Sequence, residues 1–275
     1  MSLTVRSLGS GSSGNALLLV DGDSSLLVDC GIGPRLLAKA LAASNRRVED
    51  IGAVLVTHEH IDHVRGLKAL SRHGARFIAS CGTATAARLP VESWEEIRIG
   101  ASIRAGGITV TALAVSHDAT EPCGYHIAAA SGGKIVVLTD LGCRDDSLID
   151  PLSEANLIVL EANHDLHMLR TGPYPQHLKR RVLSATGHLS NTDCGELLAT
   201  SLRRVTNPGE VWLAHLSQTN NRPQLAVSDV RQSLAAAGVA TNVISLPRQA
   251  TGPTWSAIRP NPGQTTSIQM QIPGF

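Results

Sequence analysis

The chain has 275 residues, of which 43% are hydrophobic and 17% are charged, a composition typical of a globular protein with a sizeable core. Its formal net charge of +1 excludes a chain-wide attraction to nucleic acid or to anionic membranes, so either partner would have to be held by a local patch. Aromatic residues make up 3% of the chain, which argues against recognition by base stacking.

The predicted elements begin with hairpins and continue as alternating strands and helices. Three strand-like runs, LTVRSLG, NALLLVDG and SSLLVDCG, are separated by the turn-forming segments GSGSSG and GDSS. GPRLLAKALAAS follows with the apolar spacing of a helix. Next come a strand at AVLVTH, a helix near 62–73, a strand at RFIAS, a short helix near 83–88, and strands at ITVTALAVSH, GYHIAAA and KIVVLTD.

The second half continues the alternation. Strands are expected at LIVLEAN, VWLAHL and TNVISL, and helices at HLKRRVLS, from about Thr192 to Arg204 and near 222–237. This pattern predicts an α/β fold in which hairpins and crossovers mix. We expect one domain over residues 1–246, followed by a tail over 247–275 that is rich in Pro, Thr and Gln.

The cysteines bear on the compartment. There are five, Cys30, Cys81, Cys123, Cys143 and Cys194, without a CxxC pair and without a secretory leader ahead of them. We therefore expect reduced thiols and a cytoplasmic location. No apolar run approaches the roughly 20 residues of a membrane helix, so no membrane partner is expected.

One short segment carries most of the chemistry. Residues 54–66 read VLVTHEHIDHVRG and place His58, His60, Asp62 and His63 within six positions, directly after a predicted strand. Two imidazoles can face one ion there, and the Asp–His pair can face a second. Imidazole with carboxylate suits Zn²⁺, Fe²⁺ or Mn²⁺ better than Ca²⁺ or Mg²⁺.

Six apolar runs end in a residue of this kind. The six residues are Asp29, His58, His117, Asp140, Glu161 and His215. One such residue alone would be an ordinary helix cap or turn former. Sites in α/β sheets form at the carboxyl ends of the strands, so six together favour convergence on one site.

The HxHxDH spacing resembles the signature of the metallo-β-lactamase superfamily, and the resemblance extends over roughly residues 3–245. It implies a four-layer αββα sandwich with two divalent ions, Zn or Mn, at one edge. It implies His58, His60 and His117 around one ion, Asp62, His63 and His215 around the other, Asp140 shared by both, and Asp29 supporting them from behind.

Two metal ions close together can activate a shared hydroxide, because a metal lowers the pKa of bound water from about 15.7 to about 7. Asp62 would then have a catalytic as well as a binding role. The sequence contains no GxSxG elbow and no P-loop, which agrees with hydrolysis without a side-chain nucleophile. Asp140 disfavours a β-lactam substrate, since β-lactam-hydrolysing members usually carry Cys there, and His60 disfavours a flavodiiron role.

Further segments resemble the YycJ/WalJ group, which is similar to the nuclease branch that includes RNase Z. They are SLGSGSSGNA, EANHD, GPYPQHLKRR, GHLSN and LAHLSQTNN. This resemblance implies a 5′-to-3′ DNA exonuclease, with DNA as the partner. GHLSN is also similar to an RNase Z segment, which implies that His188 donates a proton to the leaving oxygen and that Glu161 orients it. Alternatively, His188 only precedes the helix from Thr192.

Two features could contact a nucleic-acid backbone. One is an anion nest of backbone N–H groups, and the other is a local basic cluster. Their residues are Ser10, Gly11, Ser12 and Ser13, and Lys179, Arg180 and Arg181. The simpler interpretations are a glycine-rich hairpin and a solvated helix face.

Two other functions stay open. A thioester or lactone hydrolase of the glyoxalase II kind shares the same ligands, and a regulatory protein could hold metal without turnover. The 74 residues between Asp140 and His215 are too few for an inserted cap domain, so we expect an open groove. An open groove admits single or double strands, and the sequence leaves strandedness, DNA against RNA, end polarity and oligomeric state open.

Overall fold

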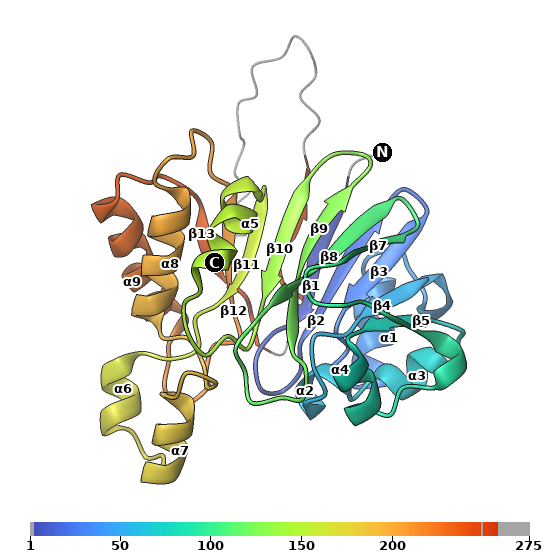
Figure 1. Cartoon of the computed structure of the whole chain (residues 1–275), viewed down its shortest axis with the longest axis horizontal. Coiled ribbons are helices and arrows are strands. Elements are labelled where there is room, and N and C mark those ends of the chain that lie inside the picture. The colour runs from blue at the N-terminus through green and yellow to red at the C-terminus, as the bar shows by residue number, and fades with distance from the viewer. Residues whose placement is uncertain (1–2, 249, 258–275) are drawn as a thin grey trace.

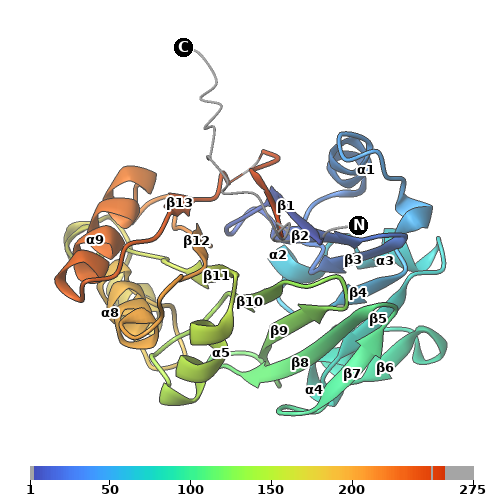
Figure 2. The same cartoon turned by 90° about the horizontal axis from the view of Figure 1, so that it is seen from above.

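The computed structural model describes residues 3–248 and 250–257, which form two seven-stranded sheets packed face to face (Figures 1 and 2). The first sheet has the order β14-β1-β2-β3-β4-β5-β6. Its strands are β1 Thr4–Gly9, β2 Ala16–Asp21, β3 Ser24–Val28, β4 Ala53–Leu55, β5 Arg76–Ala79, β6 Trp94–Glu96 and β14 Thr254–Ser256.

The second sheet has the order β13-β12-β11-β10-β9-β8-β7. Its strands are β7 Ser102–Ala105, β8 Ile108–Ala114, β9 Cys123–Ala129, β10 Lys134–Leu138, β11 Leu157–Glu161, β12 Glu210–Ala214 and β13 Val243–Ser245. The helices are α1 Pro34–Ala42, α2 Ile61–Val64, α3 Leu67–Ser71, α4 Cys81–Ala86, α5 Ile149–Glu154, α6 Leu166–Thr171, α7 Gln176–Val182, α8 Asn191–Leu202 and α9 Pro223–Ala236. Helices α5, α8 and α9 cover this sheet, and α1, α3 and α4 cover the first (Figure 2).

Strand β10 shows why the chain folds as stacked layers. Successive side chains of a strand point to opposite faces. Ile135 and Val137 therefore pack into the core between the two sheets, while Val136 and Leu138 pack against the outer helices. A strand buried on both faces reads as a continuous apolar run, which is how KIVVL appears in the sequence.

The strands that carry the candidate site run in parallel within each sheet. β3 pairs in parallel with β4, and β10, β11 and β12 pair in parallel with one another. Their carboxyl ends lie at the edge of the sandwich from which α2 and α6 begin (Figure 1). The ligand-type residues that end these strands consequently share one edge.

The structure departs from the expected elements in two segments. The single helix expected near 62–73 is wrong, because the chain forms α2 and α3 with a break at Gly66. A Cβ on Gly66 would lie 2.4 Å from Cys30 Sγ. The Gly66 N–H donates to the Cys30 carbonyl oxygen at 2.6 Å, so the helix is interrupted where it contacts the segment after β3. In the segment expected to be a tail, Thr254–Ser256 pairs with β1 as β14, while residues 249 and 258–275 lie outside the described residues.

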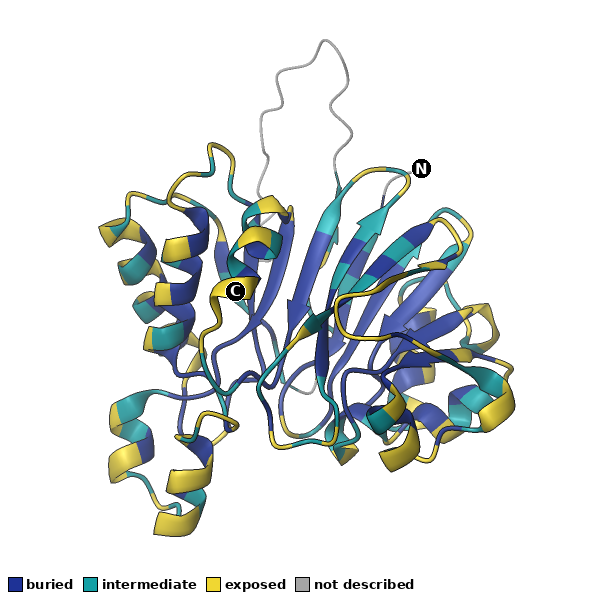
Figure 3. Ribbon diagram, in the orientation of Figure 1, coloured by how far each residue is buried: buried dark blue, intermediate teal, exposed yellow. Residues whose placement is uncertain are grey.

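Helices α6 and α7 project from the body beside this edge, and most of their residues are exposed or half-buried (Figures 1 and 3). We call residues 166–187 the α6–α7 lobe. It contains Arg170, Lys179, Arg180 and Arg181 and no Asp or Glu. Within residues 3–248 and 250–257, no helix has both the length and the apolar character needed to cross a bilayer.

Candidate metal centre

The residues that follow the strand ends adopt an unusual backbone. Asp29, Asp140 and His215 have φ angles of 59°, 56° and 53°, three of the five non-glycine residues with positive φ in the described part of the chain. A left-handed conformation costs a non-glycine residue about 1–3 kcal/mol and persists only where the surroundings enforce it, typically at functional sites. All three residues are buried.

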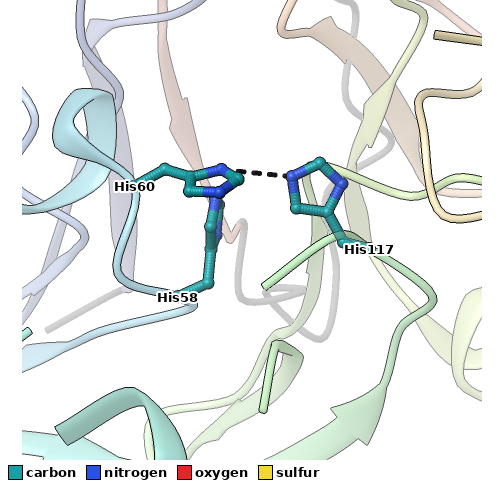
Figure 4. A group of neighbouring side chains, drawn as sticks. All are labelled: His58, His60 and His117. Carbon is teal, nitrogen blue, oxygen red and sulfur yellow. Dashed lines mark hydrogen bonds between the residues drawn. The ribbon is translucent and has the colours of Figure 1, made fainter. Parts of the chain in front are cut away.

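The first group consists of three imidazoles from two loops. His58 and His60 come from the loop after β4, and His117 comes from the loop after β8 (Figure 4). Their ring centroids lie 4.6–5.1 Å apart, and His60 Nδ1 is 3.3 Å from His117 Nε2. Their ligand atoms all lie within 4.8 Å of one another, so they could hold one ion.

The second group lies beside the first. Asp62 Oδ2 is 3.3 Å from His215 Nε2 and 3.8 Å from His63 Nε2. Asp140 stands between the groups, with Oδ2 3.0 Å from His63 Nε2 and Oδ1 3.6 Å from His117 Nε2. The structure thus brings together all seven side chains that the resemblance implies as ligands, with Asp140 facing both groups.

Four of the five imidazoles are held from behind through Nδ1, which leaves Nε2 toward the centre. The pairs are His58 with Thr57 Oγ1 at 3.0 Å, His63 with Asp29 Oδ2 at 2.7 Å, His117 with the Gly187 carbonyl oxygen at 3.0 Å, and His215 with Glu161 Oε1 at 2.8 Å. Metal-binding histidines commonly donate their other ring N–H to such a partner, which fixes the tautomer and the ring direction.

Asp29 organises two of these histidines. Its Oδ1 accepts the backbone N–H of Thr57 and its Oδ2 accepts the Thr57 hydroxyl, both at 2.8 Å. Since the Thr57 hydroxyl proton is thereby used, Oγ1 can only accept from His58 Nδ1. His58 and His63 consequently both present an Nε2 lone pair to the centre.

The donor set fits a cation. When the His63 ring is neutral with its proton on Nδ1, His63 Nε2 and Asp140 Oδ2 are both acceptors, and they face each other at 3.0 Å. The buried atoms His58 Nε2 and Asp140 Oδ2 have no hydrogen-bond partner among the described residues. Burial opposes a charged imidazole, yet the carboxylates of Asp140 and Asp29 raise the pKa of His63 to about 10. Positive charge is therefore favoured at His63, between the two carboxylates. Imidazole with carboxylate is a donor set for divalent transition metals.

Glu161 and His188 lie against this centre. His188 Nδ1 is 2.9 Å from Glu161 Oε1, and the His188 ring lies 5.1 Å from that of His117 and 5.3 Å from that of His215. Glu161 is fully buried, and its Oε2 accepts the backbone N–H groups of Leu141 and Leu189. Burial alone would raise the pKa of Glu161, but His188 and His215 lower it to about 2. The carboxylate in turn raises the pKa of His188 against the effect of burial.

Two residues of the loop suggested as an anion nest form hydrogen bonds within the protein. Ser10 is buried, and its Oγ accepts the backbone N–H of His215 at 2.9 Å. The Gly11 N–H donates to Asn15 Oδ1 at 2.7 Å, so it is already engaged. Ser12 is exposed and Ser13 is half-buried. The nest interpretation of this loop stays a prediction.

Two of the three cations in the basic cluster also have partners within the protein. Lys179 is buried, and its Nζ donates to the Arg170 carbonyl oxygen at 2.7 Å, at the end of α6. Arg181 Nε pairs with Asp118 Oδ2 at 2.5 Å. Arg180 is exposed and makes no ion pair with any described residue.

The sequence interpretation did not include two residues that reach the centre. Asn15 Nδ2 lies 3.0 Å from His63 Nε2, and the Asn15 N–H donates to the Asp62 carbonyl oxygen at 2.8 Å. Asp118 Oδ1 lies 3.3 Å from His117 Nε2. Asp118 directly follows the predicted ligand His117, and this position in the sequence could have identified it. Asn15 is 48 residues from His63, so only the folded structure shows that the two are neighbours.

Comparison with known proteins agrees with this architecture. Residues 25–216 match the family described as Beta-lactamase superfamily domain. The chain is 36% identical over 244 residues to the exodeoxyribonuclease WalJ of Streptococcus pneumoniae serotype 2 (strain D39 / NCTC 7466), covering 86% of this chain and 90% of that protein. It is 35% identical over 244 residues to the exodeoxyribonuclease YycJ of Bacillus anthracis, covering 86% of this chain and 91% of that protein.

A solved structure shows the fold. The metallo-beta-lactamase fold protein YhfI of Bacillus subtilis matches with a TM-score of 0.69 at 21% identity, covering 94% of this chain and 100% of that chain. The four-layer αββα sandwich implied by the HxHxDH resemblance is confirmed.

Proposed function

The chain belongs to the metallo-β-lactamase superfamily and, within it, to the WalJ/YycJ group, and from this premise we propose that it is a 5′-to-3′ exodeoxyribonuclease that uses two divalent ions, Zn²⁺ or Mn²⁺. As a member of this group it is a metal-dependent hydrolase. The observation that carries the proposal is the pair of imidazole groups that share Asp140.

The proposed ligands follow the two groups described above. They are His58, His60 and His117 for one ion, Asp62, His63 and His215 for the other, and Asp140 for both. Bound divalent ions lower the pKa of coordinated water and stabilise the charge that develops on the group attacked. Asp29, Thr57, Glu161 and the Gly187 carbonyl hold the imidazoles in the required tautomer, so the site is organised before substrate arrives.

We assign the proton on the leaving oxygen to His188. The buried Glu161 carboxylate accepts from Nδ1 and stabilises the protonated ring, so that His188 can deliver a proton as the phosphodiester bond breaks. The His188 side chain is 19% exposed, so a substrate can reach it, whereas Glu161 is enclosed and acts through it.

Exposed cations of the α6–α7 lobe fit a role in holding DNA. Arg170 and Arg180 are both exposed, and neither guanidinium pairs with a carboxylate of the described residues. With no acidic residue among residues 166–187, the lobe attracts phosphates beside His188. Ser12 and Ser13, on the β1–β2 loop, are further candidate contacts.

The test is degradation of strands labelled at one end. Purified protein with Mn²⁺ or Zn²⁺ is incubated with single- and double-stranded DNA and RNA, each carrying a 5′-phosphate or a 5′-hydroxyl. A 5′-to-3′ exonuclease releases a 5′ label at once as a mononucleotide and converts a 3′-labelled strand into a descending ladder. Circular single strands should survive. Asp140→Ala serves as the inactive variant, and Asp23→Ala, in the exposed β2–β3 turn, is the matched control.

Degradation by the wild type and Asp23→Ala, but not by Asp140→Ala, would support the proposal. Cleavage of circles would replace the exonuclease by an endonuclease, and a ladder from the other end would reverse the polarity. If the protein binds two ions per chain yet digests no nucleic acid, the proposal fails, and thioester and lactone substrates become the next assay.

A further inference from the structure

A carboxylate outside the proposed ligand set reaches the first imidazole group. Asp118 follows His117 in the loop after β8, and its Oδ1 lies 3.3 Å from His117 Nε2. His117 Nε2 also lies 3.3 Å from His60 Nδ1. The other ring nitrogen, Nδ1, contacts the Gly187 carbonyl oxygen, so Nε2 is the atom of His117 that can bind an ion. A carboxylate oxygen therefore lies 3.3 Å from one ligand nitrogen of the three-imidazole group.

The other oxygen of this carboxylate is held from the α6–α7 lobe. Asp118 Oδ2 pairs with Arg181 Nε at 2.5 Å, and the side chains are 30% and 56% exposed. An exposed ion pair ordinarily contributes little to stability, because water and salt screen it and because two long side chains must be ordered. What distinguishes this pair is that the backbone segments carrying the two side chains are held by other contacts.

The Asp118 loop is pinned from the metal-binding turn. Glu59, which lies between His58 and His60, accepts the backbone N–H of Thr120 at 2.8 Å and its hydroxyl at 2.6 Å, both through Oε1. The same side chain thus links the two loops that supply the three imidazoles. These two hydrogen bonds restrict movement of the loop that carries Asp118, and so keep the carboxylate near His117.

The Arg181 end is packed against backbone. A Cβ on Gly187 would lie 2.3 Å from the carbonyl oxygen of Arg181, so the chain after α7 closes tightly on the helix. Ser116 Oγ also donates to the Ala185 carbonyl oxygen at 2.7 Å, which joins this segment to the strand end before His117. The ion pair therefore joins two backbone segments that other contacts already hold in place.

We propose that Asp118 is a further oxygen donor at the first ion site and that Arg181 is a positioning residue that holds its carboxylate there. The inference rests on the metal centre of the proposed function. It changes the role of Arg181, which the sequence suggested as a phosphate contact. Asp118 would add a second carboxylate to the three imidazoles and Asp140. Carboxylate oxygens suit Mn²⁺ better than imidazole nitrogens do, so this addition shifts the preference of the site toward Mn²⁺ relative to Zn²⁺.

The test measures metal binding without substrate. Metal-free protein is titrated with Mn²⁺ alone, followed by the electron paramagnetic resonance signal of free Mn²⁺, and in parallel with Zn²⁺ by calorimetry. Asp118→Asn keeps the shape of the side chain and should weaken Mn²⁺ binding at one of two sites about 10-fold or more, the range seen when groups around a metal ligand are removed. The affinity for Zn²⁺ should change less.

Arg181→Ala should lower the Mn²⁺ affinity in the same direction, Arg181→Lys should restore part of it, and the double variant should bind no more weakly than Asp118→Asn. Such non-additivity marks residues that act as one unit. Glu95→Gln, which removes a carboxylate from the exposed pair with Arg76, and Arg180→Ala, which removes the neighbouring cation of α7, should leave metal affinity unchanged.

The outcomes separate this inference from the proposed function. If the wild type binds two ions and degrades DNA, but Asp118→Asn binds Mn²⁺ equally well, the inference is overturned and the proposed function stands. If Arg181→Ala keeps its metal affinity and only raises KM for DNA, Arg181 is a phosphate contact and its positioning role is overturned. If the wild type binds no divalent ion, both fail together.

Discussion

His188 and His215 share one acceptor, because Glu161 Oε1 lies 2.9 Å from His188 Nδ1 and 2.8 Å from His215 Nδ1. One buried carboxylate therefore orients both a proposed metal ligand and the proposed proton donor. Its other oxygen accepts the backbone N–H groups of Leu141 and Leu189, so its position is set by the backbone of the loops after β10 and before α8. Substitution of His188 should therefore leave His215 in place, whereas substitution of Glu161 should affect both histidines.

Substitution His188→Asn should affect the chemical step alone. General acid catalysis contributes about 10²–10⁴-fold, so kcat on DNA should fall by that factor while metal content stays at the wild-type level. Bis(4-nitrophenyl) phosphate provides the check, because nitrophenolate leaves without a proton. The rate on that ester should change much less than the rate on DNA, and an equal loss on both substrates would rule out the proton-donor role.

Substitution Glu161→Gln should affect binding as well as chemistry. It removes the charge that holds both His188 and His215, so we expect metal affinity to fall about 10–100-fold together with activity. Metal analysis after dialysis against a defined Mn²⁺ concentration measures the first effect. The pair of variants is decisive, since unchanged metal affinity in Glu161→Gln would mean that His215 does not need this carboxylate.

Removal of metal should abolish activity and lower stability. A chelator should stop DNA degradation, and Mn²⁺ or Zn²⁺ should restore it. Ions that bind only the folded state stabilise it by about 2.7 kcal/mol at a free concentration 100 times Kd, so Tm should rise on metal addition. Thermal unfolding of metal-free and metal-loaded protein measures the shift. The Asp140→Ala variant should show a much smaller rise, and an equal rise would place the stabilising ion elsewhere.

Substitution Asp29→Ala should destabilise even the metal-free protein. It leaves the buried Thr57 N–H and His63 Nδ1 without their acceptor, and an unpaired buried polar group costs about 1–3 kcal/mol. Urea unfolding without metal measures the loss in the free energy of unfolding. Asp21→Ala, at the half-buried end of β2, is the control, and a similar small effect of both would show that Asp29 is dispensable for folding.

Substitution Arg180→Ala should weaken DNA binding without altering the metal centre. Each lost phosphate contact lowers the slope of log K against log salt by about 0.7 on single strands, so the effect should be largest at low salt and should appear in KM rather than kcat. Binding titrations between low and moderate salt measure the slope. Arg98→Ala removes a cation outside the lobe and should leave the slope unchanged. An unchanged slope in Arg180→Ala would remove it from the proposed path of the DNA.

The strand and helix pattern predicted an α/β chain, and the family resemblance implied the four layers and the side chains that meet at the centre. Strands buried on both faces need continuous apolar runs, and KIVVL, LIVLE and EVWLA show them directly. Because parallel strands expose their carboxyl ends at one edge, His58, Asp140 and His215 could be expected to meet despite their separation in the chain. The HxHxDH spacing then pointed to the family.

Which of the basic side chains are free to contact a ligand depends on the packed fold. Lys179, Arg180 and Arg181 are equivalent as a basic run, yet Lys179 is buried against the end of α6, Arg181 is paired with Asp118, and Arg180 remains unpaired among the described residues. Likewise, Gly66 divides the helix expected near 62–73 because Cys30, in the segment after β3, lies within contact distance. Local sequence sets periodicity and residue type, whereas a side chain's partner depends on segments far away in the chain, and these become neighbours only when the sheets pack.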